Sequence, residues 1–212
     1  MEHQTPFVIS ISRQKGCGGA YLGQKLAQAL GIMYLDSNLV AEIANKLDAP
    51  VTFVEEHDER VLSIWESIIE SLSWSNPWLY NPPPVRSQAL QVSQLTTETI
   101  VKIAAEKSVV VVGRGGSYLL RSHPRHISIF LYANKQARVR RIQEVYEMSH
   151  QEAVKLVEKT DVERERYNKS LSGLEMHDAT QYNLALDTSV IGLDCAQDLI
   201  MQYVHARFPD VG

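Results

Sequence analysis

The sequence predicts an α/β protein built on a mainly parallel sheet. Five short apolar segments read as strands, at residues 7–11, 32–35, 109–112, 127–131 and 184–187, and most are separated by segments with apolar residues at helical spacing. Strands that alternate with helices favour a parallel sheet with helices on both faces and right-handed crossovers. Ligands bind at the carboxyl ends of such strands, where this sequence places its glycines and cations.

Composition predicts one compact domain covering residues 1–212, with 44% hydrophobic and 22% charged residues. A formal charge of −4 argues against nucleic acid as the main partner and favours a small phosphorylated ligand. Two cysteines, Cys17 and Cys195, make no disulfide framework. Neither a signal peptide nor a membrane span of ~20 apolar residues is recognisable. We therefore expect a cytoplasmic protein with no membrane partner, and a homo-oligomer is compatible with the sequence.

The first half of the chain begins with the strand at residues 7–11 and a helix that Gly31 ends. A second strand at residues 32–35 runs into Asp36 and Ser37. Apolar residues then hold one helical face from Val61 to Leu72. The Trp/Pro-rich residues 74–84 interrupt this helix, and we expect them to form a loop on the ligand side.

The second half of the chain begins with a helix through Ile100 and Ile103. Residues 109–112 are four consecutive valines, which suit a strand covered on both faces, and we expect this strand to be central in the sheet. The remaining predicted elements are a strand at 127–131, a helix at 135–146, a charged helix at 151–167, a strand at 184–187 and a closing amphipathic helix through 196–204.

The turn after the first strand has the composition of an anion site. It contains Arg13, Lys15 and three glycines, Gly16, Gly18 and Gly19, just before a helix N-terminus. Glycines let successive backbone N–H groups converge on phosphate oxygens, and the helix dipole adds attraction. A structural turn without a ligand is the simplest alternative, and clustered cations disfavour it.

A dinucleotide site is a second alternative. Gly16 and Gly18 precede Asp36, which lies about 20 positions on, where an acidic residue would hold a ribose. The third glycine of that fingerprint falls on Tyr21, whose bulk opposes close helix–strand packing.

A P-loop is the third interpretation, although the sequence departs from its usual motif. If Gly18 takes the second glycine position, Gly19 replaces the phosphate-binding lysine. Ala20 then replaces the hydroxyl residue that holds Mg²⁺. Lys15 is a candidate substitute that reaches the phosphates from within the turn.

Several segments in order resemble the cytidylate kinase-like family. They are residues 8–19, 111–116, 130–133 with Arg138, Arg140 and Arg141, Asp161 with Arg164 and Tyr167, and 182–188. The resemblance implies a three-layer α/β/α P-loop kinase fold with a helical NMP-binding insertion at about residues 50–95 and an arginine-bearing lid at about 145–172. It also implies transfer of the ATP γ-phosphoryl, with Mg²⁺, to CMP or dCMP.

The family's roles transfer onto particular residues. Ser37 matches a serine that contacts the nucleotide base, and Arg114 matches an arginine that holds phosphate. Asp161 and Arg164 match the lid-side pattern. The departures are Glu42 and Val157 in place of arginines, and Gly115 in place of an aspartate.

We therefore predict a site in which no residues of the protein form a metal-binding centre. The groups expected to stabilise the transferred phosphoryl are Arg13, Lys15, Arg114 and Arg164. Those expected to bind ATP are Gly16, Cys17, Gly18, Gly19, Ala20, Arg138 and Arg141. Those expected to bind the acceptor are Asp36, Ser37, Arg114, Asp161 and Arg164.

Some of these residues have simpler alternatives. Arg138 and Arg141 share a helix face, so they are either lid arginines or a solvated basic face. Asp161 is either an acceptor ligand or a salt-bridge partner of Arg164 or Arg138. Cys17 lies at a helix N-terminus, which favours its thiolate and makes oxidation plausible.

The predicted function is a nucleoside monophosphate kinase that acts on a small-molecule substrate. Gly19 and Ala20 keep a second possibility open, a nucleotide-binding regulatory or partner-binding protein with impaired catalysis. An NAD(P)-dependent oxidoreductase is the third and weakest alternative.

Overall fold

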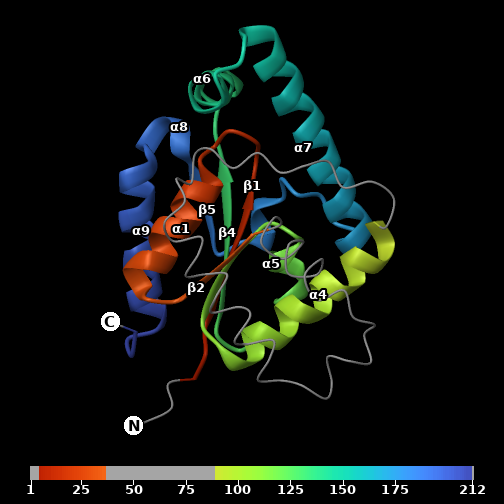
Figure 1. Cartoon of the computed structure of the whole chain (residues 1–212). Helices are drawn as coiled ribbons and strands as arrows, with labels where there is room; N and C mark the ends of the chain where they lie inside the picture. Colours follow the sequence, from red (N-terminus) through yellow and green to blue (C-terminus); the bar gives the residue numbers. More distant parts are fainter. Residues whose placement is uncertain (1–4, 37–88, 212) are drawn as a thin grey trace.

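The computed structural model describes residues 5–36 and 89–211 of the chain. Its strands are β1 (Val8–Arg13), β2 (Met33–Asp36), β3 (Val109–Val112), β4 (His126–Tyr132) and β5 (Leu184–Asp187). Its helices are α1 (Gly19–Leu30), α4 (Ala89–Glu106), α5 (Gly116–Leu119), α6 (Lys135–Tyr146), α7 (His150–Ser172), α8 (Thr188–Ile191) and α9 (Leu193–Arg207), with a 3₁₀ turn at Ala179–Gln181. Figure 1 shows this arrangement.

The five strands form one parallel sheet in the order β2-β3-β1-β4-β5. The prediction that residues 109–112 are central is therefore wrong: β1 is central, paired with β3 on one side and β4 on the other. A dinucleotide fold places its second strand beside the first. Here β3 separates β2 from β1, so the strand order disfavours the dinucleotide alternative.

Helices cover both faces of the sheet, which confirms the three-layer α/β/α prediction (Figure 1). On one face, Ile9, Ile11 and Ile129 pack against α1 and α9 in a common apolar cluster. On the other face, Val109 and Val111 pack against α4 and the end of α5. Alternate residues of each strand point to opposite faces, so an all-apolar strand needs cover on both sides.

Helix α6 follows β4 at the carboxyl end of the sheet and packs against the first turns of α7 (Figure 1). Asn134 caps α6, and Ser149 with Glu152 forms a capping box at the start of α7. Val157 is buried against α6, so the position where the family has an arginine serves packing here. Helix α7 covers most of the segment predicted as a lid, and its opening and closing stay a prediction.

Several sequence-based expectations lie outside the described residues. These are Ser37, most of the insertion at about 50–95, the helix from Val61 to Leu72 and the loop at 74–84. Among the described helices, none combines the length and apolar character that crossing a bilayer requires.

Candidate functional site

The glycine turn joins β1 to α1 in a conformation that requires glycine. Gly16 and Gly18 have φ values of 84° and 88°, in the left-handed region. A Cβ on Gly16 would lie 2.6 Å from the carbonyl oxygen of Arg138, so the turn also packs closely against α6. Both glycines have a backbone conformation that favours glycine, and their role in an anion-binding turn stays a prediction.

Arg13, the last residue of β1, covers the position where a P-loop usually has its lysine. A Cβ on Gly19 would lie 2.8 Å from Cγ of Arg13, and a Cβ on Gly113 would overlap the Arg13 guanidinium. The side chain therefore runs across Gly19 to the end of β3. Because residue 19 has no side chain, the Arg13 side chain can occupy the space beside its Cα.

Arg164 of α7 meets Arg13 at the turn. Arg164 Nη1 donates to the carbonyl oxygen of Arg13 over 3.0 Å. Burial, followed by the charge of Arg13, lowers the pKa of Arg164 to about 9. Burial also lowers the pKa of Arg13, and nearby Arg114 adds to that lowering. Partly desolvated cations that repel one another are stabilised by a bound anion.

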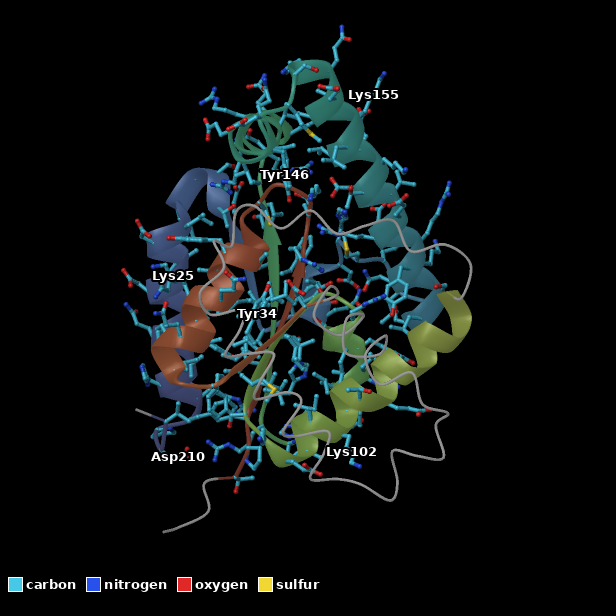
Figure 2. The ribbon with its side chains drawn as sticks, in the orientation of Figure 1. Lys25, Tyr34, Lys102, Tyr146, Lys155 and Asp210 are labelled. Carbon is cyan, nitrogen blue, oxygen red and sulfur yellow. The ribbon has the colours of Figure 1, made fainter. Side chains whose placement is uncertain are left out.

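Lys15 lines a cavity together with Arg13 and Arg164. Its Nζ donates to the hydroxyl of Tyr146 over 3.3 Å and lies 4.9 Å from the centre of that ring. Figure 2 shows Tyr146 at the end of α6, close to the turn after β1. The cavity has a volume of about 140 Å³, and Lys15, Arg13, Arg141 and Arg164 all line it.

Arg138 is buried, and its guanidinium bonds to protein groups. Its Nε donates to the carbonyl oxygen of Ala133 over 3.0 Å, and its Nη1 donates to that of Lys15 over 3.1 Å. Nη1 also pairs with Asp161 at 2.5 Å, in a largely buried ion pair. The solvated-face alternative is therefore wrong for Arg138, and its role as a lid arginine stays a prediction.

Asp161 forms an ion pair with Arg138, one of the two salt-bridge partners that the sequence suggested for it. Its Oδ1 accepts the backbone N–H of Lys15 over 2.7 Å, and its Oδ2 accepts from Arg138. Arg141 remains at the cavity, where its Nη1 donates to the carbonyl oxygen of Gly16 over 3.2 Å.

The segment after β3 holds Arg114 between two glycines. Arg114 has a φ of 55°, in the left-handed region, beside the carboxyl end of β1. A Cβ on Gly115 would overlap Cδ2 of Leu171 from α7. The aspartate that the resemblance implies at this position would therefore require the Leu171 side chain to move.

Asp36 ends β2 and accepts the Tyr34 hydroxyl over 3.1 Å. Burial lowers the pKa of Arg13, and the charge of Asp36 offsets part of that lowering, so Asp36 lies within electrostatic reach of Arg13. This arrangement brings the predicted acceptor-side carboxylate near the predicted phosphate-side cations.

Cys17 points into the core, and the expectation of a reactive thiolate is wrong. Its side chain is fully buried, and burial raises the pKa of the thiol. Its carbonyl oxygen accepts from the Thr188 hydroxyl over 2.8 Å. Only its backbone remains a candidate for ligand binding.

The described residues fit a triphosphate better than a metal ion. The turn offers glycine backbone and converging cations, whereas the exposed Ala20 has no oxygen in its side chain. In the described parts of the chain, acidic, histidine and cysteine side chains do not gather in threes. Mg²⁺ would therefore be held chiefly by phosphate oxygens and water.

Sequence reasoning missed two groups at this site. Tyr146 orients Lys15, but nothing in its spacing distinguishes it from other helical tyrosines. Ser117 of α5 exchanges hydrogen bonds with Ser10 at 3.1 Å and Ser12 at 3.0 Å, which ties α5 to β1 just before Arg13. Alternating serines in an apolar strand are the only signal that could have indicated this network.

Comparisons with known proteins find relatives over most of the chain. The chain is 25% identical over 199 residues to a cytidylate kinase of Pyrobaculum islandicum, covering 93% of this chain and 92% of the relative. It is 23% identical to a cytidylate kinase of Pyrobaculum neutrophilum over the same shares of the two chains.

Two solved structures share the fold. An uncharacterized protein from Eubacterium ventriosum has a TM-score of 0.71 at 21% identity, covering 95% of this chain and 99% of that one. Shikimate kinase from Bacteroides thetaiotaomicron has a TM-score of 0.53 at 11% identity, covering 94% and 98%. The family model described as "Cytidylate kinase-like family" matches residues 8–190, and the chain therefore belongs to that family.

Proposed function

We propose that this protein is a kinase that transfers the γ-phosphoryl group of MgATP to a nucleoside monophosphate, with CMP and dCMP as the first candidates. The observation that carries the proposal is the convergence of Arg13 and Arg164 with Lys15 on the glycine turn. The names of the Pyrobaculum relatives support cytidylate as the acceptor. A small-molecule substrate and a cytoplasmic location belong to the same proposal.

The chemistry asks mainly for positioning and positive charge. A phosphate oxygen of the acceptor forms a bond to Pγ, and the bond from Pγ to the oxygen bridging to ADP breaks. Mg²⁺, bound with ATP, supplies part of the charge neutralisation when present. In this proposal Arg13 and Arg164 bind the γ-phosphate oxygens, and their desolvation strengthens their attraction for charge that develops there.

A second candidate function keeps ATP binding without transfer. It is motivated by Gly19 and Ala20, which remove a lysine and a metal-binding hydroxyl from the turn. Arg13 lies across Gly19, and this placement favours the kinase because the lost charge has a substitute.

Incubation with MgATP and a panel of nucleoside monophosphates tests the proposal. We expect a diphosphate product with CMP or dCMP, and a large loss of rate in Arg164→Gln. Arg166→Gln on the exposed face of α7 is the matched control and should keep wild-type turnover. Clear ATP binding with no phosphorylated product from any acceptor would establish the second candidate instead.

A further inference from the structure

Three backbone carbonyls of the glycine turn each accept a hydrogen bond from an arginine of α6 or α7. The donors are the Nη1 atoms, and the pairs are Arg164 to Arg13 at 3.0 Å, Arg138 to Lys15 at 3.1 Å and Arg141 to Gly16 at 3.2 Å. Arginines that the sequence suggests as phosphate ligands therefore hold the turn itself.

A held carbonyl fixes the direction of the next N–H group. In a trans peptide the C=O and the following N–H point to opposite sides, and the described residues contain no cis peptide. The peptide between Arg13 and Gln14 shows the effect: Arg164 binds its C=O, and its N–H donates the other way to Leu131 over 3.1 Å.

The same rule applies to the next two held carbonyls, those of Lys15 and Gly16. Arg138 and Arg141 draw these carbonyls toward α6, which turns the N–H groups of Gly16 and Cys17 to the opposite side of the backbone. Neither N–H donates to another of the residues that the structure describes. Successive N–H groups on one side of a turn form an anion-binding concavity.

Asp161 fixes Arg138 in this position. The two side chains are only 17% and 8% exposed, and Asp161 also accepts the N–H of Lys15. Buried ion pairs contribute little to net stability because desolvation offsets their attraction. Asp161 binds the backbone N–H of Lys15, and Arg138 binds its backbone C=O. These contacts indicate that the pair sets the backbone geometry at Lys15.

We propose that Arg138 and Asp161 are positioning residues that orient the Lys15–Gly16 peptide for phosphate binding. They act through the backbone of the turn and do not touch the nucleotide. This inference rests on the proposed function, in which the turn binds the phosphates of ATP. It also couples the docking of α7 to the shape of the phosphate site.

Two conservative variants test the role. Arg138→Lys keeps the charge but cannot donate to Ala133 and Lys15 from a planar fork. Asp161→Asn keeps an oxygen for the Lys15 N–H and loses the ion pair. We expect each to weaken ADP and tripolyphosphate binding about tenfold, the effect of losing one charge-assisted hydrogen bond.

Glu158→Gln is the matched control. It breaks the Lys135–Glu158 ion pair, which also joins α6 to α7 at 2.5 Å but is more than half exposed. It should leave the Kd of both ligands unchanged. Backbone amide NMR of the free proteins should show the Gly16 and Cys17 signals shifted in Arg138→Lys and Asp161→Asn and unmoved in Glu158→Gln.

The inference would be overturned if both variants kept wild-type ligand affinity and unshifted Gly16 and Cys17 amide signals and differed only in a lower Tm. The proposed function would still stand. If Arg138→Lys does not fold, Asp161→Asn decides alone. If the wild-type protein binds neither ADP nor tripolyphosphate, the proposed function fails, and shifted amides would then still support the orientation of the peptide by this pair.

Discussion

Arg13 lies across Gly19, so that a Cβ on residue 19 would come within 2.8 Å of Cγ and 3.0 Å of Cβ of the arginine. The first of these atoms belongs to a side chain that can move, but the second is fixed by the backbone of β1. A side chain at residue 19 and the present position of Arg13 therefore exclude each other.

Gly19→Ala is expected to displace Arg13, lower stability by about 1–3 kcal/mol, as overpacking does, and weaken ATP binding. Thermal unfolding and calorimetric titration with ATP measure the two effects. Gln28→Ala, at an exposed position of the same helix, is the control. Unchanged ATP affinity in Gly19→Ala would mean that Arg13 does not serve the phosphate site.

Gly19→Lys restores the residue that a P-loop usually has, yet we expect it to lower activity because the new side chain must displace Arg13. Arg13→Ala combined with Gly19→Lys makes room for the lysine. We expect this double variant to recover part of the lost ATP affinity. Steady-state kinetics should show a lower KM for ATP in the double variant than in Gly19→Lys. A lower KM in Gly19→Lys than in the double variant would contradict this expectation.

Gly115→Asp restores the carboxylate that relatives carry, but its Cβ would overlap Leu171. Both the φ of 64°, which strains a residue with a Cβ, and the contact with the end of the Leu171 side chain contribute to an expected loss of about 1–3 kcal/mol. Leu171→Ala should relieve the contact but not the strain, giving a partly non-additive double-mutant cycle in urea unfolding. Additive effects would show that α7 does not pack on Gly115 in solution.

His126 is expected to contribute to acid unfolding. Burial, with a smaller effect of His123, lowers its pKa from 6.5 to about 4. Between these two values the unfolded chain binds more protons than the folded one, so stability is lost as pH falls through that window. The shift corresponds to at most about 3 kcal/mol. Urea unfolding of wild type and His126→Gln should show a shallower pH dependence for the variant, and parallel curves would contradict the assignment.

The strands were predictable because each is a short, nearly all-apolar segment, and β5 and α6 have the predicted bounds. The central position of β1 was not predictable. Both β1 and β3 are covered on two faces, and burial on two faces gives the same apolar pattern at either place in the sheet. The short helices α5 and α8 were missed because four residues carry no detectable periodicity.

Helical spacing placed Arg138 and Arg141 on one face of α6, but spacing does not identify what packs against that face. Helix α7 packs against that face and buries Arg138 against Asp161, whereas Arg141 lines the cavity at the glycine turn. Cys17 shows the same limit. Its place at a helix N-terminus favours a thiolate, whereas its burial, visible only in three dimensions, raises its pKa.

The sequence by itself determined the glycine turn between Arg13 and Gly19 and the loss of the usual lysine and hydroxyl, because these are local facts of residue type and spacing. Only the tertiary structure decided that Arg13 fills the space at Gly19 and that Asp161 and Arg138 hold the backbone of Lys15. Asp161 and Lys15 are 146 positions apart in the chain. Contacts of that separation depend on how α7 docks, and no local pattern in the sequence encodes that docking.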